Sequence, residues 1–212
     1  SEPDSPDINA LPALSSGHFV VSCLNNLSKV NAAVIGLWSK ILTALPQARL
    51  LLGNVTDGPV RQRIVDRFAQ FGIAPERLIL QPRVSLLDYL ALHHRIDLAL
   101  DPFPYNGGTT SFDTVWMGVP LVSLAGNTCI SRMGVMIANT VGHPEWVATD
   151  ESTYVQIALR LASDVGALNQ VRHGLRKEME QSLLMDGTGF AQSFAEALAQ
   201  MWAMKCGELT KS

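Results

Sequence analysis

The sequence predicts an α/β domain with a doubly wound parallel sheet, and three observations support this fold class. The chain has 212 residues, of which 47% are hydrophobic and 17% charged, so it can bury a large core. Short runs that are apolar at every position alternate with amphipathic segments, as expected when helices cover both faces of a parallel sheet. Only helical periodicity follows the last such run, which predicts helices appended at the C-terminal end.

The expected strands are short apolar runs, and each is followed by a turn, a loop or a helix. Gly53 and Asn54, for example, close the second run. The strands are expected at residues 18–23, 49–52, 77–80, 96–100, 119–124 and 145–147.

The expected helices lie between these runs and after them. Pro46 ends the first helix, whereas the second has Pro59 near its first turn and Gly72 just beyond its end. In the last helix, apolar side chains recur on one face. The helices are expected at residues 30–45, 59–71, 86–94, 110–117, 131–140, 153–163, 165–182 and 190–204.

The composition argues against several classes of protein. The formal net charge is −3, so the chain has no basic surface suited to a nucleic-acid backbone. Its apolar stretches are interrupted well before the ~20 residues that a membrane-spanning helix needs. The three cysteines are far apart and lack metal-binding spacing, which favours a reducing, cytoplasmic location.

Residues 1–17 are rich in proline, serine, aspartate and asparagine, and we expect a linker or tail there. Residues 18–212 are then expected to form one domain. The acidic, proline-containing residues 1–7 do not resemble a signal peptide. A start of this kind is expected if a longer protein precedes it.

The loop after the fourth apolar run is the first candidate for a ligand site, because doubly wound folds bind ligands at the carboxyl ends of strands. Gly107 and Gly108 leave the backbone accessible, and Thr109 and Thr110 bring hydroxyl and amide groups to a helix start. Such a helix start is a typical anion site. Asp113, one turn later, can accept hydrogen bonds from sugar hydroxyls. The alternative is a proline-rich turn with a threonine N-cap.

The loop after the first run offers a positive charge to the same edge of the sheet. Asn25, Asn26 and Ser28 supply polar groups, and Lys29 can neutralise a phosphate that arrives there. The alternative is a solvated lysine beside an Asx turn.

The loop after the third run could recognise a nucleotide base. The backbone at Arg83 and Val84 could pair with a base edge, and the Tyr89 ring could stack on the base. The alternative is a helix start in which Ser85 is the N-cap and Tyr89 belongs to the core.

Several common motifs are absent from the sequence. There is no G-x-G-x-x-G, no G-x-x-x-x-G-K-[ST] and no G-x-S-x-G, which argues against NAD, P-loop and hydrolase sites. There is also no Asp-x-Asp, so a metal-bridged nucleotide diphosphate is not indicated. A protein cation and a helix dipole would have to take the place of the metal.

The run at residues 101–120, DPFPYNGGTTSFDTVWMGVP, is followed by LAGNTCISR at 124–132. Together they resemble the O-linked N-acetylglucosamine transferase/SPINDLY family, family 41 of the glycosyltransferases, and the resemblance extends over residues 19–202. It implies a GT-B fold with two Rossmann-like halves, in which the C-terminal half binds most of the nucleotide sugar. This chain corresponds to that C-terminal half.

The resemblance implies which residues contact the diphosphate. Asn26 and Lys29 match the family's amide and lysine at the diphosphate, where the lysine stabilises the leaving group. Thr109 and Thr110 match the threonines at the β-phosphate. Gly108 stands where some members have histidine, so one side-chain donor to the phosphate is missing.

The resemblance also implies the contacts of the nucleoside. Val84, with its neighbour Arg83, occupies the backbone position that pairs with uracil, and Tyr89 the position of a ring stacked on the base. Asp113 matches the carboxylate on the ribose hydroxyls. Leu86 stands where some members have lysine, which leaves the identity of base and sugar open.

The implied function is the donor-binding half of a UDP-GlcNAc-type protein O-glycosyltransferase that inverts the anomeric centre and needs no metal. Its partners would be the nucleotide sugar, a protein acceptor with serine or threonine hydroxyls, and an N-terminal Rossmann-like half that these residues do not contain. The chain alone is therefore expected to be inactive, with the apolar face of its last helix partly uncovered. Three alternatives remain open: a GDP-fucose-dependent transferase half, a nucleotide-sugar-binding interaction module without transfer activity, and an unrelated α/β domain whose glycine-rich loop is only a turn.

Overall fold

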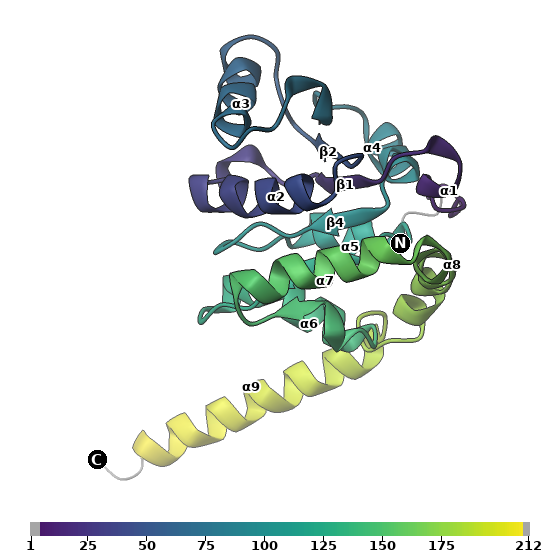
Figure 1. Ribbon diagram of the computed structural model, residues 1–212. Helices are drawn as coiled ribbons and strands as arrows, with labels where there is room; N and C mark the ends of the chain where they lie inside the picture. The colour runs from purple at the N-terminus through teal and green to yellow at the C-terminus, as the bar shows by residue number, and fades with distance from the viewer. Residues whose placement is uncertain (1–4, 210–212) are drawn as a thin grey trace.

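Within residues 5–209, which the computed structural model describes, six parallel strands form one sheet (Figure 1). The strand order is β3-β2-β1-β4-β5-β6, so the direction of winding reverses between β1 and β4. This arrangement confirms the predicted doubly wound fold. The strands are β1 Val20–Cys23, β2 Arg49–Leu52, β3 Leu78–Leu80, β4 Leu98–Leu100, β5 Leu121–Leu124 and β6 Val147–Ala148.

Helices cover both faces of the sheet, and the strands alternate their side chains between two apolar clusters. Val21 and Leu50 point into the cluster beneath α2, α3 and α7, whereas Val20 and Leu51 point into the one beneath α5, α6 and α8. The helices are α1 Ala13–Ser16, α2 Ala32–Ala44, α3 Pro59–Ala69, α4 Leu86–Leu92, α5 Thr109–Trp116, α6 Met133–Thr140, α7 Glu151–Ser163, α8 Val165–Glu180 and α9 Gly187–Leu209. Every predicted helix and the first five predicted strands are present, with ends shifted by a few residues. The last strand was predicted at residues 145–147, but residues 145 and 146 belong to a 3-10 helix and β6 begins at Val147. Helix α1 was not predicted.

Five of the helices begin at a side chain that caps the first turn, and in α9 the Asp186 side chain accepts from the backbone of Gly189. Ser85 starts α4, as the alternative to base recognition predicted, because its side chain accepts a hydrogen bond from the backbone of Asp88. Asn31, Asp150 and Asp164 do the same for α2, α7 and α8. Helix α5 begins at Gly108 without a side-chain cap, as do α1, α3 and α6 at their own first residues.

Part of the segment predicted as a linker is packed against the domain. Leu11 is only 1% exposed, and its backbone N–H donates to Asn169 Oδ1 at 2.9 Å. The N–H of Ala13 donates to Asp97 Oδ1 at 2.8 Å, and Arg172 Nε donates to the carbonyl of Asn9. Residues 9–13 therefore do not form a free linker, because their partners lie far along the chain, whereas residues 14–17 are exposed. Residues 1–4 lie outside the described residues.

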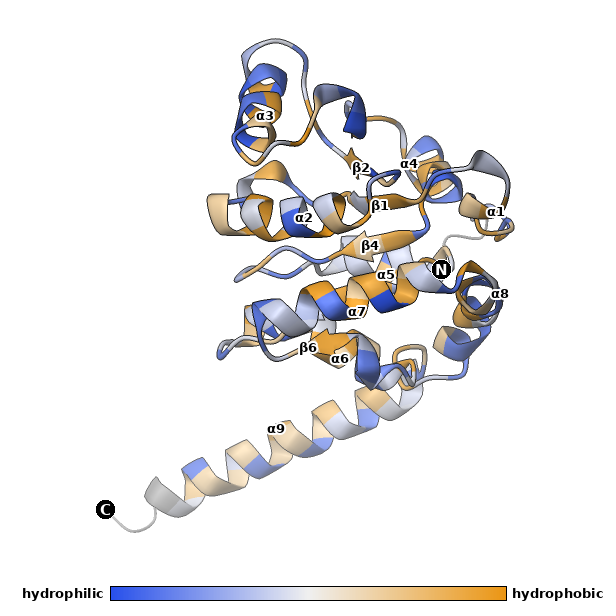
Figure 2. Cartoon of the chain, in the orientation of Figure 1, coloured by the Kyte–Doolittle hydropathy of each residue, from blue (hydrophilic) through white to orange (hydrophobic). Residues whose placement is uncertain are grey.

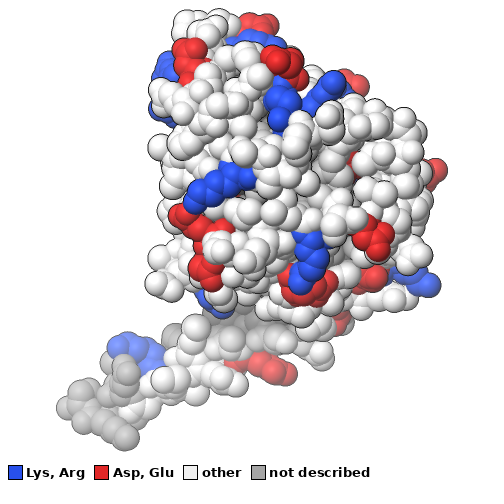
Figure 3. Space-filling view, viewed as in Figure 1, with Lys and Arg blue, Asp and Glu red and all other residues white. Residues whose placement is uncertain are grey.

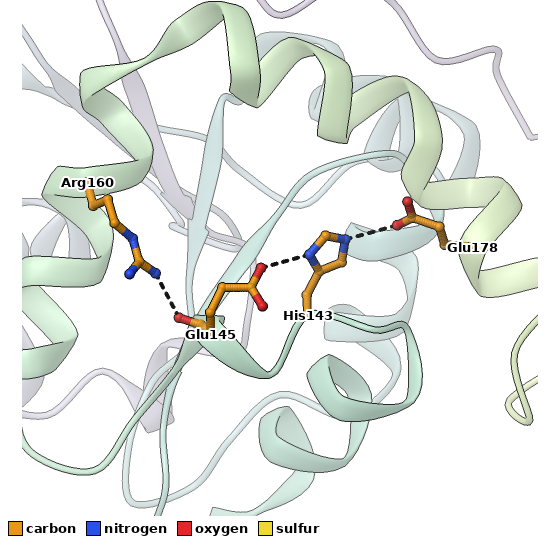
Figure 4. Close-up of polar contacts among 4 residues, drawn as sticks. All are labelled: His143, Glu145, Arg160 and Glu178. Carbon is orange, nitrogen blue, oxygen red and sulfur yellow. Dashed lines mark hydrogen bonds and ion pairs between the residues drawn. The ribbon is translucent and has the colours of Figure 1, made fainter.

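Strand β6, at the edge of the sheet, is joined to two helices through a short 3-10 helix, Pro144–Trp146 (Figure 4). The ring of His143 lies between Glu145 Oε1, 2.9 Å from Nδ1, and Glu178 Oε2 on α8, 3.0 Å from Nε2. The same ring stacks on Trp146 with its centroid 3.9 Å away. Arg160 on α7 donates to the carbonyl of Glu145. These contacts attach α7 and α8 to the edge of the sheet.

Helix α9 projects away from the rest of the domain, with apolar residues along its length (Figure 2). Phe190 is 69% exposed and Trp202 is 72% exposed. The expected uncovered apolar face is therefore present. None of the helices in residues 5–209 is long and apolar enough to cross a membrane. On the face shown in Figure 3, positive and negative side chains are interspersed.

Candidate functional site

A pocket of about 280 Å³ opens at the carboxyl ends of the strands, close to the point where the strand order reverses. Its lining comes from the residues that follow β1, β2 and β3 and from the start of α5. Six residues predicted from two separate loops meet in it. The pocket is lined by Leu24, Gly53, Asn54, Pro82, Arg83, Val84, Leu86, Tyr89, Leu92, Thr109, Thr110 and Asp113.

The start of α5 forms one wall of the pocket through Thr109 and Thr110. The N-cap is Gly108 rather than a threonine, and no side chain caps the helix. The first N–H groups of a helix have no acceptor within the helix and carry its positive dipole end. A Cβ atom at Gly108 would meet nothing within 4 Å, so the backbone is open there. This geometry favours an anion site over a threonine-capped turn.

Gly107 has a different role from its neighbour, since it is packed tightly on the inner side of the loop. A Cβ atom here would lie 2.0 Å from Ser111 Oγ and 3.0 Å from Asn25 Nδ2. Its N–H donates to Asp101 Oδ1 at 2.7 Å. A larger residue at this position would have to displace the Ser111 hydroxyl and press on the Asn25 amide.

Asp101 directly follows β4 and begins the glycine-containing loop, but it was not among the predicted site residues. Its side chain is fully buried and accepts hydrogen bonds from Gly107, Ser111 and Ser123. Burial raises the pKa of this carboxyl to about 7, against the lowering effect of its donors and of Lys29. The sequence could have identified Asp101 as a candidate, because it is an acidic residue directly after an apolar strand, at the edge where parallel sheets bind ligands.

Lys29 connects the loop after β1 to the glycine-containing loop after β4. Its Nζ atom donates to the carbonyl of Asn106 at 2.8 Å and to Asn25 Oδ1 at 3.2 Å, and it lies 4.3 Å from the centroid of the Tyr105 ring. Burial lowers the pKa of Lys29, whereas the nearby Asp101 charge raises it. The lysine is held beside the pocket rather than in its lining.

The amide nearest the glycine-containing loop belongs to Asn25 and not to the predicted Asn26. Asn26 is exposed and is the N-cap of the 3-10 helix Leu27–Lys29. Its side-chain oxygen accepts a hydrogen bond from the backbone N–H of Ser28. Asn25 is buried and faces Gly107 and Lys29. Neighbouring residues in a turn point in different directions, and the sequence alone did not distinguish them.

Tyr89 and Asp113, predicted to contact base and ribose, are hydrogen-bonded to each other. The Tyr89 hydroxyl donates to Asp113 Oδ2 at 3.1 Å, and its ring meets His93 edge-on at 5.3 Å. Burial raises the pKa of both Tyr89 and Asp113. One carboxylate oxygen of Asp113 thus has a fixed donor, and the carboxylate lines the pocket.

Two further pocket residues, Gly53 and Asn54, were predicted only as the end of a strand. A Cβ atom at Gly53 would lie 3.2 Å from the Cα atom of Leu24, so the two loops touch through backbone. Asn54 has a left-handed backbone conformation with φ of 59° and donates to the carbonyl of Leu24. The rule that ligands bind at strand ends could have included them.

A comparison with known protein families shows to which family the chain belongs. The family described as Glycosyl transferase family 41 matches residues 11–194. The chain belongs to this family. The family 41 match includes the packed part of the N-terminal segment from residue 11 and extends into α9 as far as residue 194.

Curated relatives carry the same type of domain within much longer chains. A Petunia hybrida protein named "Probable UDP-N-acetylglucosamine--peptide N-acetylglucosaminyltransferase SPINDLY" is 36% identical over 207 residues, which are 96% of this chain and 22% of that protein. A Caenorhabditis elegans "UDP-N-acetylglucosamine--peptide N-acetylglucosaminyltransferase" is 28% identical over 86% of this chain and 16% of its own. The chain spans about a fifth of the Petunia relative's length.

Solved structures support the same family 41 assignment. A mutant O-GlcNAc transferase from Thermobaculum terrenum superposes with a TM-score of 0.87 at 35% identity, covering 97% of this chain and 39% of that one. Sucrose-phosphate synthase from Thermosynechococcus elongatus has a TM-score of 0.61 at 17% identity, covering 88% of this chain and 46% of its own, a likeness of fold alone. The domain thus has the fold of one half of a GT-B glycosyltransferase.

Proposed function

We propose that this domain binds the nucleotide-sugar donor of a family 41 protein O-glycosyltransferase, with a UDP-GlcNAc-type donor. The observation that carries the proposal is the uncapped start of α5, which faces a pocket lined by Thr109 and Thr110, with Lys29 held nearby. The names of the relatives support the choice of donor.

The donor diphosphate would lie against the start of α5. The amide and hydroxyl groups of Thr109 and Thr110 would contact phosphate oxygens, and the open backbone at Gly108 lets the phosphate approach closely. Lys29 lies in the adjoining loop and would supply the positive charge that the diphosphate requires. Helix dipole and lysine together would replace a metal ion in neutralising the diphosphate.

The nucleoside would occupy the rest of the pocket. The backbone at Arg83 and Val84 would pair with the base edge, and the Tyr89 ring would flank the base. The carboxylate of Asp113 would accept hydrogen bonds from the ribose hydroxyls. The Tyr89 hydroxyl already holds this carboxylate in place.

The reaction would be a direct displacement with inversion at the anomeric carbon. The acceptor serine or threonine oxygen would form the new bond to that carbon and lose its hydroxyl proton to a base on the acceptor side of the centre. The bond from the anomeric carbon to the β-phosphate oxygen would break at the same time and leave its electron pair on the diphosphate. Lys29 and the α5 amides would stabilise that growing negative charge. The acceptor side of the centre would come from another part of the enzyme, and the chain alone would bind donor without transfer. The setting would be cytoplasmic, in keeping with three cysteines that form no disulfide among the described residues.

Calorimetric titration of the 212-residue chain with UDP and with GDP, without added metal, tests the proposal. We expect saturable UDP binding that weakens at least tenfold in Asp113→Ala and in Lys29→Ala. Lys40→Ala on α2 is the matched control, because Lys40 is an exposed lysine outside the pocket. Preference for GDP would replace the proposed donor with GDP-fucose, and binding of neither nucleotide would contradict the proposal.

A further inference from the structure

Asp101 is a fully buried charged residue at the edge of the site, and the proposed contacts with the donor do not use it. Its Oδ1 atom accepts from the N–H of Gly107 at 2.7 Å and from Ser111 Oγ at 3.4 Å. Its Oδ2 atom accepts from Ser123 Oγ at 2.7 Å. All three partners are donors, as a carboxylate requires when it is removed from water.

The space around the Asp101 carboxylate is closed on two sides by glycines. A Cβ atom at Gly107 would collide with Ser111 Oγ, one of the donors to the carboxylate. On the other side, a Cβ atom at Gly134 of α6 would lie 2.7 Å from Asp101 Oδ2 and 2.1 Å from Ser123 Oγ. The carboxylate therefore has one position, fixed between the loop and α6.

Both donors on Oδ1 belong to the structure that forms the proposed phosphate site. Gly107 is next to Gly108, the N-cap of α5, and Ser111 lies in the first turn of that helix. Asn106, on the other side of Gly107, is the residue whose carbonyl accepts from Lys29. A single carboxylate thus holds the segment that carries both the α5 amides and the acceptor of Lys29.

We infer that Asp101 is a positioning residue of the diphosphate site, which fixes Gly107 and Ser111 and thereby orients the amides at the start of α5. The inference rests on the proposed function, because Asp101 would support the same diphosphate site. Asp101 would not touch the donor itself, since its side chain is fully buried.

A buried carboxylate behind a phosphate site has a measurable electrostatic consequence. Lys29, Cys23 on β1 and Tyr154 on α7 are the titratable groups whose charges couple to Asp101. Because its pKa is raised to about 7, Asp101 takes up a proton near neutrality. A bound diphosphate adds negative charge nearby and raises this pKa further, so binding is accompanied by proton uptake. Affinity should be highest below pH 7 and fall as the pH rises above it.

The experiment is calorimetric titration of the 212-residue chain with UDP-GlcNAc between pH 6 and pH 8.5. This ligand is chosen because its phosphates are diesters without a proton that titrates near neutrality. The variants are Asp101→Ala, which removes the acceptor, and Asp101→Asn, which keeps an oxygen for Gly107 and places an amide against Ser123 Oγ. Asp97→Asn is the matched control, since Asp97 is a buried aspartate on the same strand segment but outside the pocket. Thermal unfolding of each variant gives the folded fraction.

We expect Asp101→Ala to weaken binding at least tenfold at every pH. Asp101→Asn should retain affinity within threefold of the wild-type value at pH 6, with a flat pH profile, whereas Asp97→Asn should keep the wild-type profile. Wild-type affinity should fall severalfold from pH 6 to pH 8.5. If Asp101→Ala does not fold, the pH dependence of affinity in the wild type and in Asp101→Asn tests the inference. Wild-type affinity independent of pH, or Asp101→Ala binding within twofold of wild type, overturns the inference. Lack of any wild-type binding contradicts the proposed function instead.

Discussion

Two buried aspartates near the two ends of β4 show how one residue type can serve the fold or the site. Asp97, just before the strand, accepts from the backbone of Val20 at 2.7 Å and of Ala13 at 2.8 Å. Asp101, just after the strand, accepts from Gly107 and from two serine hydroxyls. Both side chains are fully buried.

The two aspartates differ in the cation that faces each of them. Asp97 is near Arg172, which is also buried and whose guanidinium donates to the carbonyls of Ile96, His93 and Asn9. The cation near Asp101 is Lys29, which is only half-buried and lies beside the pocket. The N-terminal segment and Arg172 surround the Asp97 carboxylate, whereas Asp101 lies behind the start of α5, which lines the proposed donor pocket. We therefore expect substitutions around Asp97 to lower the stability of the domain, and substitutions around Asp101 to lower its affinity for the nucleotide.

Arg172→Met should cause the largest loss of stability. It leaves the Asp97 carboxylate without its cation and three carbonyls without their donor, which we expect to cost about 3–5 kcal/mol. Urea denaturation monitored by circular dichroism would measure the loss. Arg95→Met, at an exposed arginine nearby, should change stability by less than about 0.5 kcal/mol. A loss of stability in Arg172→Met no larger than that in Arg95→Met would contradict the structural role that we assign to Asp97 and Arg172.

Asp101 should make the domain less stable as the pH rises toward 7. Its pKa is raised from 3.8 to about 7 on folding, so the folded state binds more protons than the unfolded state between these values. Stability from this group is present at low pH and declines by up to roughly 1.4 kcal/mol per pH unit as the pH rises.

Urea denaturation of wild type and Asp101→Asn at pH 5 and pH 7.5 would measure this effect. The variant should gain stability relative to wild type at the higher pH, because it has no proton to lose. An equal difference between the two proteins at both pH values would show that Asp101 does not titrate as its burial indicates.

Gly107→Ala and Gly108→Ala compare the inner and the outer side of one loop. The methyl group at residue 107 would overlap Ser111 and should cost about 1–3 kcal/mol of stability. The methyl group at residue 108 meets nothing, so stability should change by less than about 0.5 kcal/mol while UDP affinity falls, since the phosphate would approach there. Thermal unfolding and calorimetry on both variants would measure the two effects, and similar results for both glycines would contradict this division.

Tyr89→Phe should have the smallest effect. The substitution keeps the ring in the pocket but removes the donor to Asp113, which should weaken UDP binding by about 0.5–1.5 kcal/mol. Calorimetry with UDP and with 2′-deoxy-UDP would test it. The variant should discriminate less between the two ligands if the hydroxyl acts through Asp113, and unchanged discrimination would show that it does not.

Most of the fold could be predicted because its signals are local. Strand β2 is apolar and buried at its last three positions because both of its faces are covered there, and this pattern appears directly in the sequence. The sequence also placed Thr109, Thr110 and Asp113 correctly in one helix start. The segment around Leu11 was predicted incorrectly as a free linker, because its partner Asn169 is 158 residues away.

By itself, the sequence determined the succession of strands and helices, the loop that carries the glycines and threonines, and membership of family 41. Only the tertiary structure decided that Asn25 and not Asn26 faces this loop, that Gly53 and Asn54 join the pocket, and that Asp101 supports it from behind. The physical reason is the range of the interactions involved. Burial and helical periodicity are visible within a few residues, whereas the direction of a side chain in a turn depends on what packs against it from distant strands.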